Sequence, residues 1–320
     1  MKTIVIGSLN TDLVATGIKK FPNPGEHVYG KELIIGPGGK SRNIADMIAH
    51  LASTNSVAMI SRTVRDSYGL WRPPMDALTK VGVNTDYVKV LDPSETNKLP
   101  AIALIPVDQN GNNQIFVLPG VSDDFSTNDI DDALPLFEEV GQNEGFLVTT
   151  LECPLETVNH SVRVANEHGL KVIFDPGGIE EDVNLDDLLK SGIYLIKPNE
   201  HETKILTGIE VVDFESAQLA ASKLQDKGIT NVLITVGVNG AYLFTDESQK
   251  HFPIPEVQAG DDKDETGCGD QTIAALVAGL QEGKQMDEAV GSAILAGTLQ
   301  FHRLGIKPLD KKELLNIIPG

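Results

Sequence analysis

The stretch Asp264-Glu265-Thr266-Gly267-Cys268-Gly269-Asp270 stands directly before residues 271–280, whose apolar side chains recur at helical spacing. Two glycines let the backbone turn tightly and direct successive N–H groups at one point, and a helix start adds partial positive charge. The pattern therefore predicts an anion-binding turn made by the amides of residues 267–269. Asp270 lies at its edge, where a carboxylate could accept a proton from an attacking hydroxyl. A plain glycine turn with Asp270 as helix N-cap is the alternative.

Before this stretch, short apolar strands alternate with helical segments along the chain. Such alternation predicts a parallel sheet with helices on both faces, so we expect a doubly wound, mostly parallel α/β fold. The strands are expected at 146–150, 171–174, 193–196 and 232–235, and the helices at 155–168, 200–206, 214–227, 271–280 and 287–302.

The first 120 residues contain two β-rich segments of different character. Segment 13–36 is rich in glycine and proline, and segment 98–119 reads as a hairpin with Asn110-Gly111 at its turn. We expect the two segments to pair into a small second sheet over a large domain. That domain would comprise 1–12, 37–97 and 120–320, with strands at 3–7 and 56–60 and helices at 43–51 and 68–81, the last interrupted at Pro73-Pro74.

Composition excludes several classes of protein. The 320 residues include 46 acidic and 26 basic side chains, a net charge of −20, and 41% are hydrophobic. This usage is globular, and so negative a field disfavours binding to nucleic acid or to anionic membranes. With two cysteines, no zinc-ligand spacing, no signal peptide and no long apolar run, we expect a cytoplasmic protein.

Three further motifs could carry chemistry. Residues 36–43 form a glycine-rich loop before a helix, but Ile34 stands where a phosphate loop needs glycine, so the loop suits hydroxyls or a simple anion. Asn199 and Glu202 follow a strand and would share one helical face, where they could hold the waters of Mg²⁺ or merely cap the helix. The stretch 235–240 reads on its own as a turn.

Taken in chain order, these segments resemble the ribokinase-like (phosphofructokinase-B type) family of carbohydrate kinases. The resemblance spans nearly the whole chain, and the family's large doubly wound α/β domain with a small β lid matches the arrangement expected above. The motifs that carry it are Asn10-x-Asp12, Gly38-Gly39-Lys40 with Asn43, Asp66-x-x-Gly69, Leu151-Glu152-x-Pro154, Asn199-x-x-Glu202, Thr235-x-Gly237-x-x-Gly240 and Thr266-Gly267-Cys268-Gly269-Asp270.

The resemblance implies transfer of the γ-phosphoryl group of ATP, with Mg²⁺, to a hydroxyl of a sugar, a sugar phosphate or a nucleoside. Asp270 would be the base, and the Gly267, Cys268 and Gly269 amides would form the anion hole. The sugar would be held by Asn10, Asp12, Gly39, Lys40, Asn43 and Glu152. The nucleotide site would be lined by Asn199, Thr235, Gly237 and Gly240, and Asn199 and Glu202 would organise Mg²⁺ through water. A monovalent cation such as K⁺ would match Asp264 and the Thr266 carbonyl, with Arg303 and Gly305, and a homodimer through the lid is a further implication.

Several positions depart from the family pattern. Ser41 and Arg42 replace a glycine and an alanine, Arg62 and Arg65 replace glycines, and Cys268 replaces an alanine, which raises the question of a reactive thiol. Four of the six arginines lie between residues 42 and 72, namely Arg42, Arg62, Arg65 and Arg72. Because arginine forks suit phosphate groups, this cluster supports the hypothesis of a phosphorylated acceptor held by Arg42 and Arg65, although the arginines could instead pair with neighbouring carboxylates or lie on the surface.

Two other functions stay open, a nucleoside kinase and a catalytically silent regulator that binds a sugar or a nucleotide on the same fold. The intact Asp270 argues against the silent regulator. A dehydrogenase is remote, because the chain has no dinucleotide-binding fingerprint.

Overall fold

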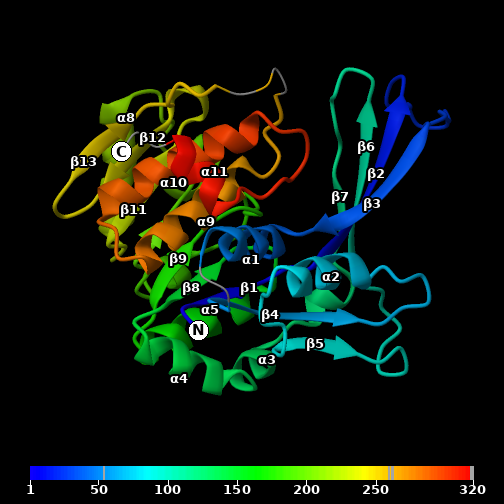
Figure 1. Ribbon diagram of the computed structural model, residues 1–320, viewed down its shortest axis with the longest axis horizontal. Helices are drawn as coiled ribbons and strands as arrows, with labels where there is room; N and C mark the ends of the chain where they lie inside the picture. Colours follow the sequence, from blue (N-terminus) through cyan, green and yellow to red (C-terminus); the bar gives the residue numbers. More distant parts are fainter. Residues whose placement is uncertain (53–54, 259, 261–262, 318–320) are drawn as a thin grey trace.

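The computed structural model describes residues 1–52, 55–258, 260 and 263–317. Its main sheet has nine strands in the order β13-β12-β11-β10-β9-β8-β1-β4-β5 (Figure 1). Every neighbouring pair from β11 to β5 is parallel, and β12 and β13 add an antiparallel edge. The strands are β1 (Thr3–Ile6), β4 (Val57–Val64), β5 (Val88–Leu91), β8 (Phe146–Thr149), β9 (Lys171–Phe174), β10 (Leu195–Ile196), β11 (Asn231–Thr235), β12 (Ala241–Phe244) and β13 (Gln249–Phe252).

Helices cover both faces of this sheet and bury two apolar cores. Alternate residues of β1 point to opposite faces, so Val5 joins one core while Ile4 and Ile6 join the other. The doubly wound α/β prediction is therefore confirmed. The first core packs α1 (Lys40–Leu51), α2 (Arg72–Lys80), α9 (Cys268–Gln281), α10 (Met286–Phe301) and α11 (Lys311–Ile317); the second packs α3 (Thr127–Asp131), α4 (Leu134–Gln142), α5 (Leu155–Glu167), α6 (Asp186–Leu189), α7 (Glu200–Thr207) and α8 (Phe214–Gln225).

A second, four-stranded sheet projects from the main body (Figure 1). The two β-rich segments pair in it as predicted, with β2 and β6 parallel at its centre and an antiparallel strand on either side. Within the first segment the sequence predicts short strands at 26–29 and 32–35, but residues 26–29 form no strand. Strand β2 also begins already at Asn10, opposite Gly38, inside the range expected for the large domain. The strands are β2 (Asn10–Ile18), β3 (Glu32–Gly38), β6 (Ala101–Asp108) and β7 (Phe116–Leu118).

Three helices begin elsewhere than the sequence pattern indicated. Helix α1 starts at Lys40 rather than at Asn43, so the lysine lies in its first turn. Helix α2 starts at Arg72, which puts Pro73 and Pro74 in a first turn that needs no N–H donors, so they begin the helix instead of interrupting it. Helix α9 starts at Cys268, and Asp270 therefore stands in its first turn rather than at its N-cap.

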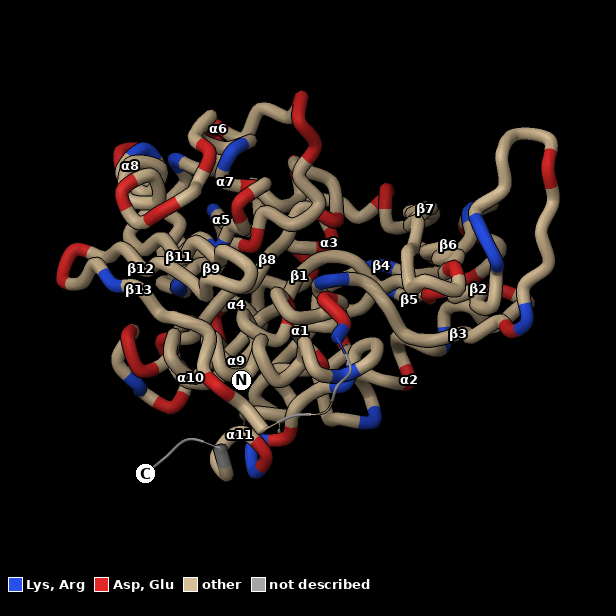
Figure 2. The backbone as a smooth tube through the Cα atoms, turned by 90° about the horizontal axis from the view of Figure 1, so that it is seen from above, with Lys and Arg blue, Asp and Glu red and all other residues tan. Residues whose placement is uncertain are grey.

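Acidic positions occur all around the molecule rather than on one face (Figure 2). Figure 2 also shows the second sheet extending away from the main sheet and its helices. Within the described ranges, no helix combines the length and the apolarity needed to cross a membrane.

Candidate active site

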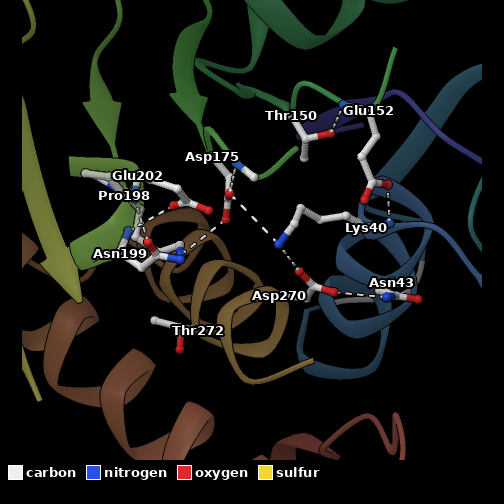
Figure 3. A network of polar contacts seen from close by, with 12 residues as sticks. Lys40, Asn43, Thr150, Glu152, Asp175, Pro198, Asn199, Glu202, Asp270 and Thr272 are labelled. Atoms are coloured by element: carbon white, nitrogen blue, oxygen red, sulfur yellow. Dashed lines mark hydrogen bonds and ion pairs between the residues drawn. The ribbon is translucent and has the colours of Figure 1, made fainter. Parts of the chain in front are cut away.

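The candidate site lies where parallel strands of the main sheet end and two helices begin. Glu152 follows β8, Asp175 follows β9 and Asn199 follows β10, while Lys40 and Asp270 stand in the first turns of α1 and α9 (Figure 3). Carboxyl ends of parallel strands share one edge of the sheet, which is why loops far apart in sequence meet there.

Asp270 is held by two donors from α1. Its Oδ1 lies 3.0 Å from Lys40 Nζ, and its Oδ2 accepts a hydrogen bond of 2.9 Å from Asn43 Nδ2 (Figure 3). The residue is only 5% exposed, so these bonds fix the carboxylate in one orientation. The structure thus joins Asp270 to two predicted residues that precede it by 230 and 227 positions.

The sequence motifs did not indicate two residues of the site, Asp175 and Lys197. Lys197 Nζ lies 3.2 Å from Asp175 Oδ2, and Lys40 Nζ lies 4.0 Å from the other oxygen. Burial by itself would raise the pKa of Asp175, but Lys197 and Lys40 outweigh it and lower that pKa. Burial would likewise lower the pKa of Lys40, yet Asp175 and Asp270 raise it. Asp175 directly follows β9, and Glu152 stands three residues after the end of β8; this position after a strand was the available signal.

The residues predicted to hold a sugar surround the start of α1. Glu152 accepts hydrogen bonds from the Ser8 hydroxyl and, at 2.8 Å, from the Lys40 backbone N–H. Burial, reinforced by the nearby Glu152 and opposed by Arg42, raises the pKa of Asp12 to about 6. These groups form a cluster of polar side chains near Asp270, of types that can hydrogen-bond a hydroxyl group.

Gly39, the residue before α1, lets the backbone approach this cluster. Its φ is +91°, and a Cβ there would lie 2.9 Å from the Ser8 carbonyl oxygen and 3.0 Å from the Asn10 nitrogen. Only glycine avoids both the left-handed strain and the contact with Ser8 and Asn10.

The turn before α9 has the conformation expected of an anion hole. Gly267 caps the helix at φ +77°, and within the described residues the Gly267 and Gly269 N–H groups have no acceptor. The Cys268 N–H instead donates to the Glu265 carbonyl at 3.2 Å. Burial, together with the neighbouring Asp264 and Glu265, raises the pKa of the Cys268 thiol to about 12, so the structure gives no support to a reactive thiolate.

Asn199 and Glu202 cap α7 reciprocally. The Asn199 side-chain oxygen accepts from the Glu202 N–H at 2.8 Å, and Glu202 Oε2 accepts from the Asn199 N–H at 2.9 Å. Burial and the neighbouring Asp175 raise the pKa of Glu202. The Glu202 and Asp175 carboxylates repel each other and lie beside the Asn199 side-chain amide. Carboxylate and amide oxygens are ligands of the kind that Mg²⁺ prefers, so Asn199 and Glu202 fit that ion as well as the cap.

The stretch 235–240 forms a turn next to the Asn199 cap. The Thr235 N–H donates to the Pro198 carbonyl at 3.0 Å, and Val236 N–H donates to the Gly240 carbonyl at 2.8 Å across the 3₁₀ turn η2 (Gly237–Asn239). The predicted nucleotide residues therefore lie beside the predicted Mg²⁺ residues.

The arginines have internal partners or lie on the surface. Arg42 is 1% exposed, with Nη1 2.9 Å from Asp46 Oδ2, and Arg62 Nη2 lies 2.9 Å from Asp129 Oδ1. Arg65 is exposed over the Trp71 ring, 5.8 Å from its centroid. For Arg42 and Arg62 the geometry favours pairing with a neighbouring carboxylate over binding of a phosphorylated acceptor.

The place that the resemblance implied for a monovalent cation does not fit one. The carbonyls of Thr266 and Gly305 both accept hydrogen bonds from the Gln300 side-chain amide, and Asp264 accepts the N–H groups of Thr266 and Gly305. Arg303 is engaged with Glu313 at 3.0 Å.

Comparisons with known proteins find similarity over most of the chain. The sequence pattern of the "pfkB family carbohydrate kinase" matches residues 2–310. Ribokinase of Haemophilus influenzae is 32% identical over 301 residues, which cover 94% of this chain and 92% of that protein. Deoxyribokinase of Salmonella typhi is 30% identical over 295 residues, covering 92% and 90%. The structure of Arabidopsis thaliana ribokinase complexed with ribose and ATP superposes with a TM-score of 0.83 at 27% identity, covering 98% of this chain and 97% of that one.

Proposed function

Because this chain belongs to the pfkB family of carbohydrate kinases, we propose that it transfers the γ-phosphoryl group of ATP to a hydroxyl of a pentose such as ribose or 2-deoxyribose. Family membership makes it a phosphotransferase whose acceptor is an alcohol group. The pentose is supported by similarity to ribokinase and deoxyribokinase over more than nine-tenths of the chain. The nucleotide is supported by the likeness to a ribokinase bound to ribose and ATP.

The observation that carries the proposal is the Asp270 carboxylate, fixed by Lys40 and Asn43 beside the N–H groups that start α9. Asp270 accepts the proton of the sugar hydroxyl as that oxygen forms its bond to the γ-phosphorus and the bond to the β-phosphate oxygen breaks. The free Gly267 and Gly269 amides stabilise charge on the transferring group, and Cys268 joins them once its N–H leaves Glu265. Phosphoryl transfer needs mainly this positioning and charge stabilisation.

The charges around the acceptor favour a neutral sugar. Asp12, Glu152 and Asp270 gather at the start of α1, and their carboxylates suit the hydroxyl groups of a sugar held also by Asn10 and the Gly39-Lys40 backbone. A phosphorylated sugar would bring two further negative charges among them. The buried charge of Arg42 is already neutralised by Asp46, so it does not offset this repulsion.

ATP with Mg²⁺ would occupy the part of the site between α7 and α9. Asn199 and Glu202 would hold the ion through its waters, and Mg²⁺ would there neutralise charge on the phosphates. Thr235, Gly237 and Gly240 would line the nucleotide, since their turn adjoins the Asn199 cap.

The second sheet is proposed to act as a lid, and a second copy of the chain is proposed to pack on its outer side. Successive residues of β3 and β7, which point to opposite faces, are exposed and apolar, so both faces are uncovered. One face would close over the sugar and exclude water as a competing acceptor. The other would bury its apolar side chains in a dimer, which light scattering can detect. The exposed residues are Leu33, Ile34, Ile35, Phe116, Val117 and Leu118.

A substrate panel tests the proposal. ADP release is measured with ribose, 2-deoxyribose, fructose, the corresponding sugar phosphates and nucleosides. We expect a neutral pentose to give the highest kcat/KM. Preference for a sugar phosphate or a nucleoside would refute the assignment of the acceptor, and binding of sugar and ATP without turnover would identify a silent regulator.

A further inference from the structure

A glutamine side chain lies between the two segments that frame the start of α9. Gln300, near the end of α10, is fully buried. Its Nε2 donates to the Gly305 carbonyl at 2.7 Å and to the Thr266 carbonyl at 3.1 Å. The amide thus links the turn after α10 to the loop before α9.

Asp264 links the same two segments a second time. Its Oδ1 accepts the Thr266 N–H at 2.9 Å, its Oδ2 accepts the Gly305 N–H at 2.8 Å, and its own N–H donates to the Phe301 carbonyl at 2.8 Å. Backbone donors at both segments are therefore satisfied by a carboxylate, and backbone acceptors at both segments are satisfied by an amide.

The orientation of the Gln300 amide follows from its partners. With Nε2 and Oε1 exchanged, an oxygen would face two carbonyl oxygens, which repel it, so the donor end must point at Thr266 and Gly305. Gln300 Oε1 is buried without a partner among the described residues, which makes the two donor bonds the interactions that hold the side chain there.

We propose that the Gln300 amide replaces a monovalent cation in this protein and keeps the anion-hole turn in place without one. A cation bound at this point would need the oxygens of Thr266 and Gly305 that the amide already occupies. Gln300 Nε2 lies near the anion hole, 3.8 Å from the position that a Cβ on Gly267 would take, and its bond to the Thr266 carbonyl holds the residue directly before Gly267. The inference rests on the proposed kinase function and deepens it.

The test compares K⁺ with tetramethylammonium at equal ionic strength, in the parent protein and in Gln300→Ala. The parent is expected to have the same turnover and the same Tm in both salts. Gln300→Ala frees the carbonyl oxygens of Thr266 and Gly305 beside the Asp264 carboxylate, so K⁺ should raise its turnover by about tenfold or more and its Tm by about 2 °C or more over tetramethylammonium.

Gln300→Met keeps the side-chain length without donors and provides a second variant if the alanine variant does not fold; it should be less active and less stable than the parent in either salt. Gln271→Ala is the matched control, because Gln271 is also fully buried but accepts from Leu309 N–H instead of donating to these carbonyls. It should lose stability without gaining a response to K⁺.

A parent protein whose turnover or Tm rises specifically with K⁺ would overturn the inference, as would variants of Gln300 that match the parent in both salts. The Tm comparison needs no substrate, so it remains decisive even if the panel of sugars shows no kinase activity.

Discussion

Replacing Asp270 by asparagine removes the proposed base while preserving the shape of the side chain. The carboxylate now accepts from Lys40 Nζ at 3.0 Å and from Asn43 Nδ2 at 2.9 Å. An asparagine offers one acceptor oxygen, so one of the two donors must face an NH₂ group. Asn43 cannot turn to accept from it without cost, because its own oxygen accepts from Arg42.

Two effects therefore add. Loss of a general base lowers turnover by about 10²–10⁴-fold, which corresponds to about 3–5 kcal/mol in the barrier. The mismatched donor costs about 1–3 kcal/mol in folding free energy. The expected outcome for Asp270→Asn is a kcat at least two orders of magnitude lower, with a moderately lower unfolding midpoint.

The assay is ADP release with the best sugar of the panel, combined with calorimetric titration of ATP and urea unfolding. ATP binding should be preserved, since Asp270 is proposed to contact the sugar hydroxyl. Asp226→Asn is the control, because Asp226 is exposed at the end of α8. If Asp270→Asn folds, binds ATP and keeps kcat within about tenfold of the parent, the assignment of the base is wrong.

Three further outcomes follow from the structure. With a pKa of about 6, the Asp12 carboxylate is protonated as the pH falls through that value and then accepts hydrogen bonds from sugar hydroxyls less well, so the KM for the sugar should rise. In Asp12→Asn this pH dependence of KM should vanish. Its persistence would contradict the proposed contact between Asp12 and the sugar. Gly39→Ala should lower the free energy of unfolding by about 1–3 kcal/mol, because its φ of +91° and the close Ser8 carbonyl oppose a Cβ; an unchanged urea midpoint would show otherwise. Arg42→Met should cost about 3–5 kcal/mol in urea unfolding, because it leaves the buried Asp46 carboxylate with only His50, 3.6 Å away, as an ion-pair partner. A folded variant with an altered choice between sugars and sugar phosphates would return Arg42 to the sugar site.

The spacing of apolar residues was enough to predict a parallel sheet covered by helices. Alternate residues of β1 contribute to two cores, and strands that alternate with helices form parallel sheets with both faces buried. The glycine pattern before α9 also predicted a turn with free N–H groups, because this conformation depends on local backbone freedom; this holds for Gly267 and Gly269, whereas the Cys268 N–H donates to Glu265.

The spacing of residues in the sequence does not reveal which distant side chains form pairs. Asp175 follows a strand and could have been suspected, but its partnership with both Lys197 and Lys40 depends on strand order. Arg42 and Asp46 stand four residues apart in a helix, so their pairing was open to inference, whereas the burial that makes it structural was not.

The amino-acid order by itself determined the elements of this protein, its glycine turns and the residue types available for phosphoryl transfer, because these follow from local spacing and backbone preference. Only the tertiary structure decided which charges neutralise one another and that the Gln300 amide meets the carbonyls of Thr266 and Gly305. Those outcomes depend on distances of a few ångströms between segments far apart in sequence, which arise only when the sheet and its helices pack together.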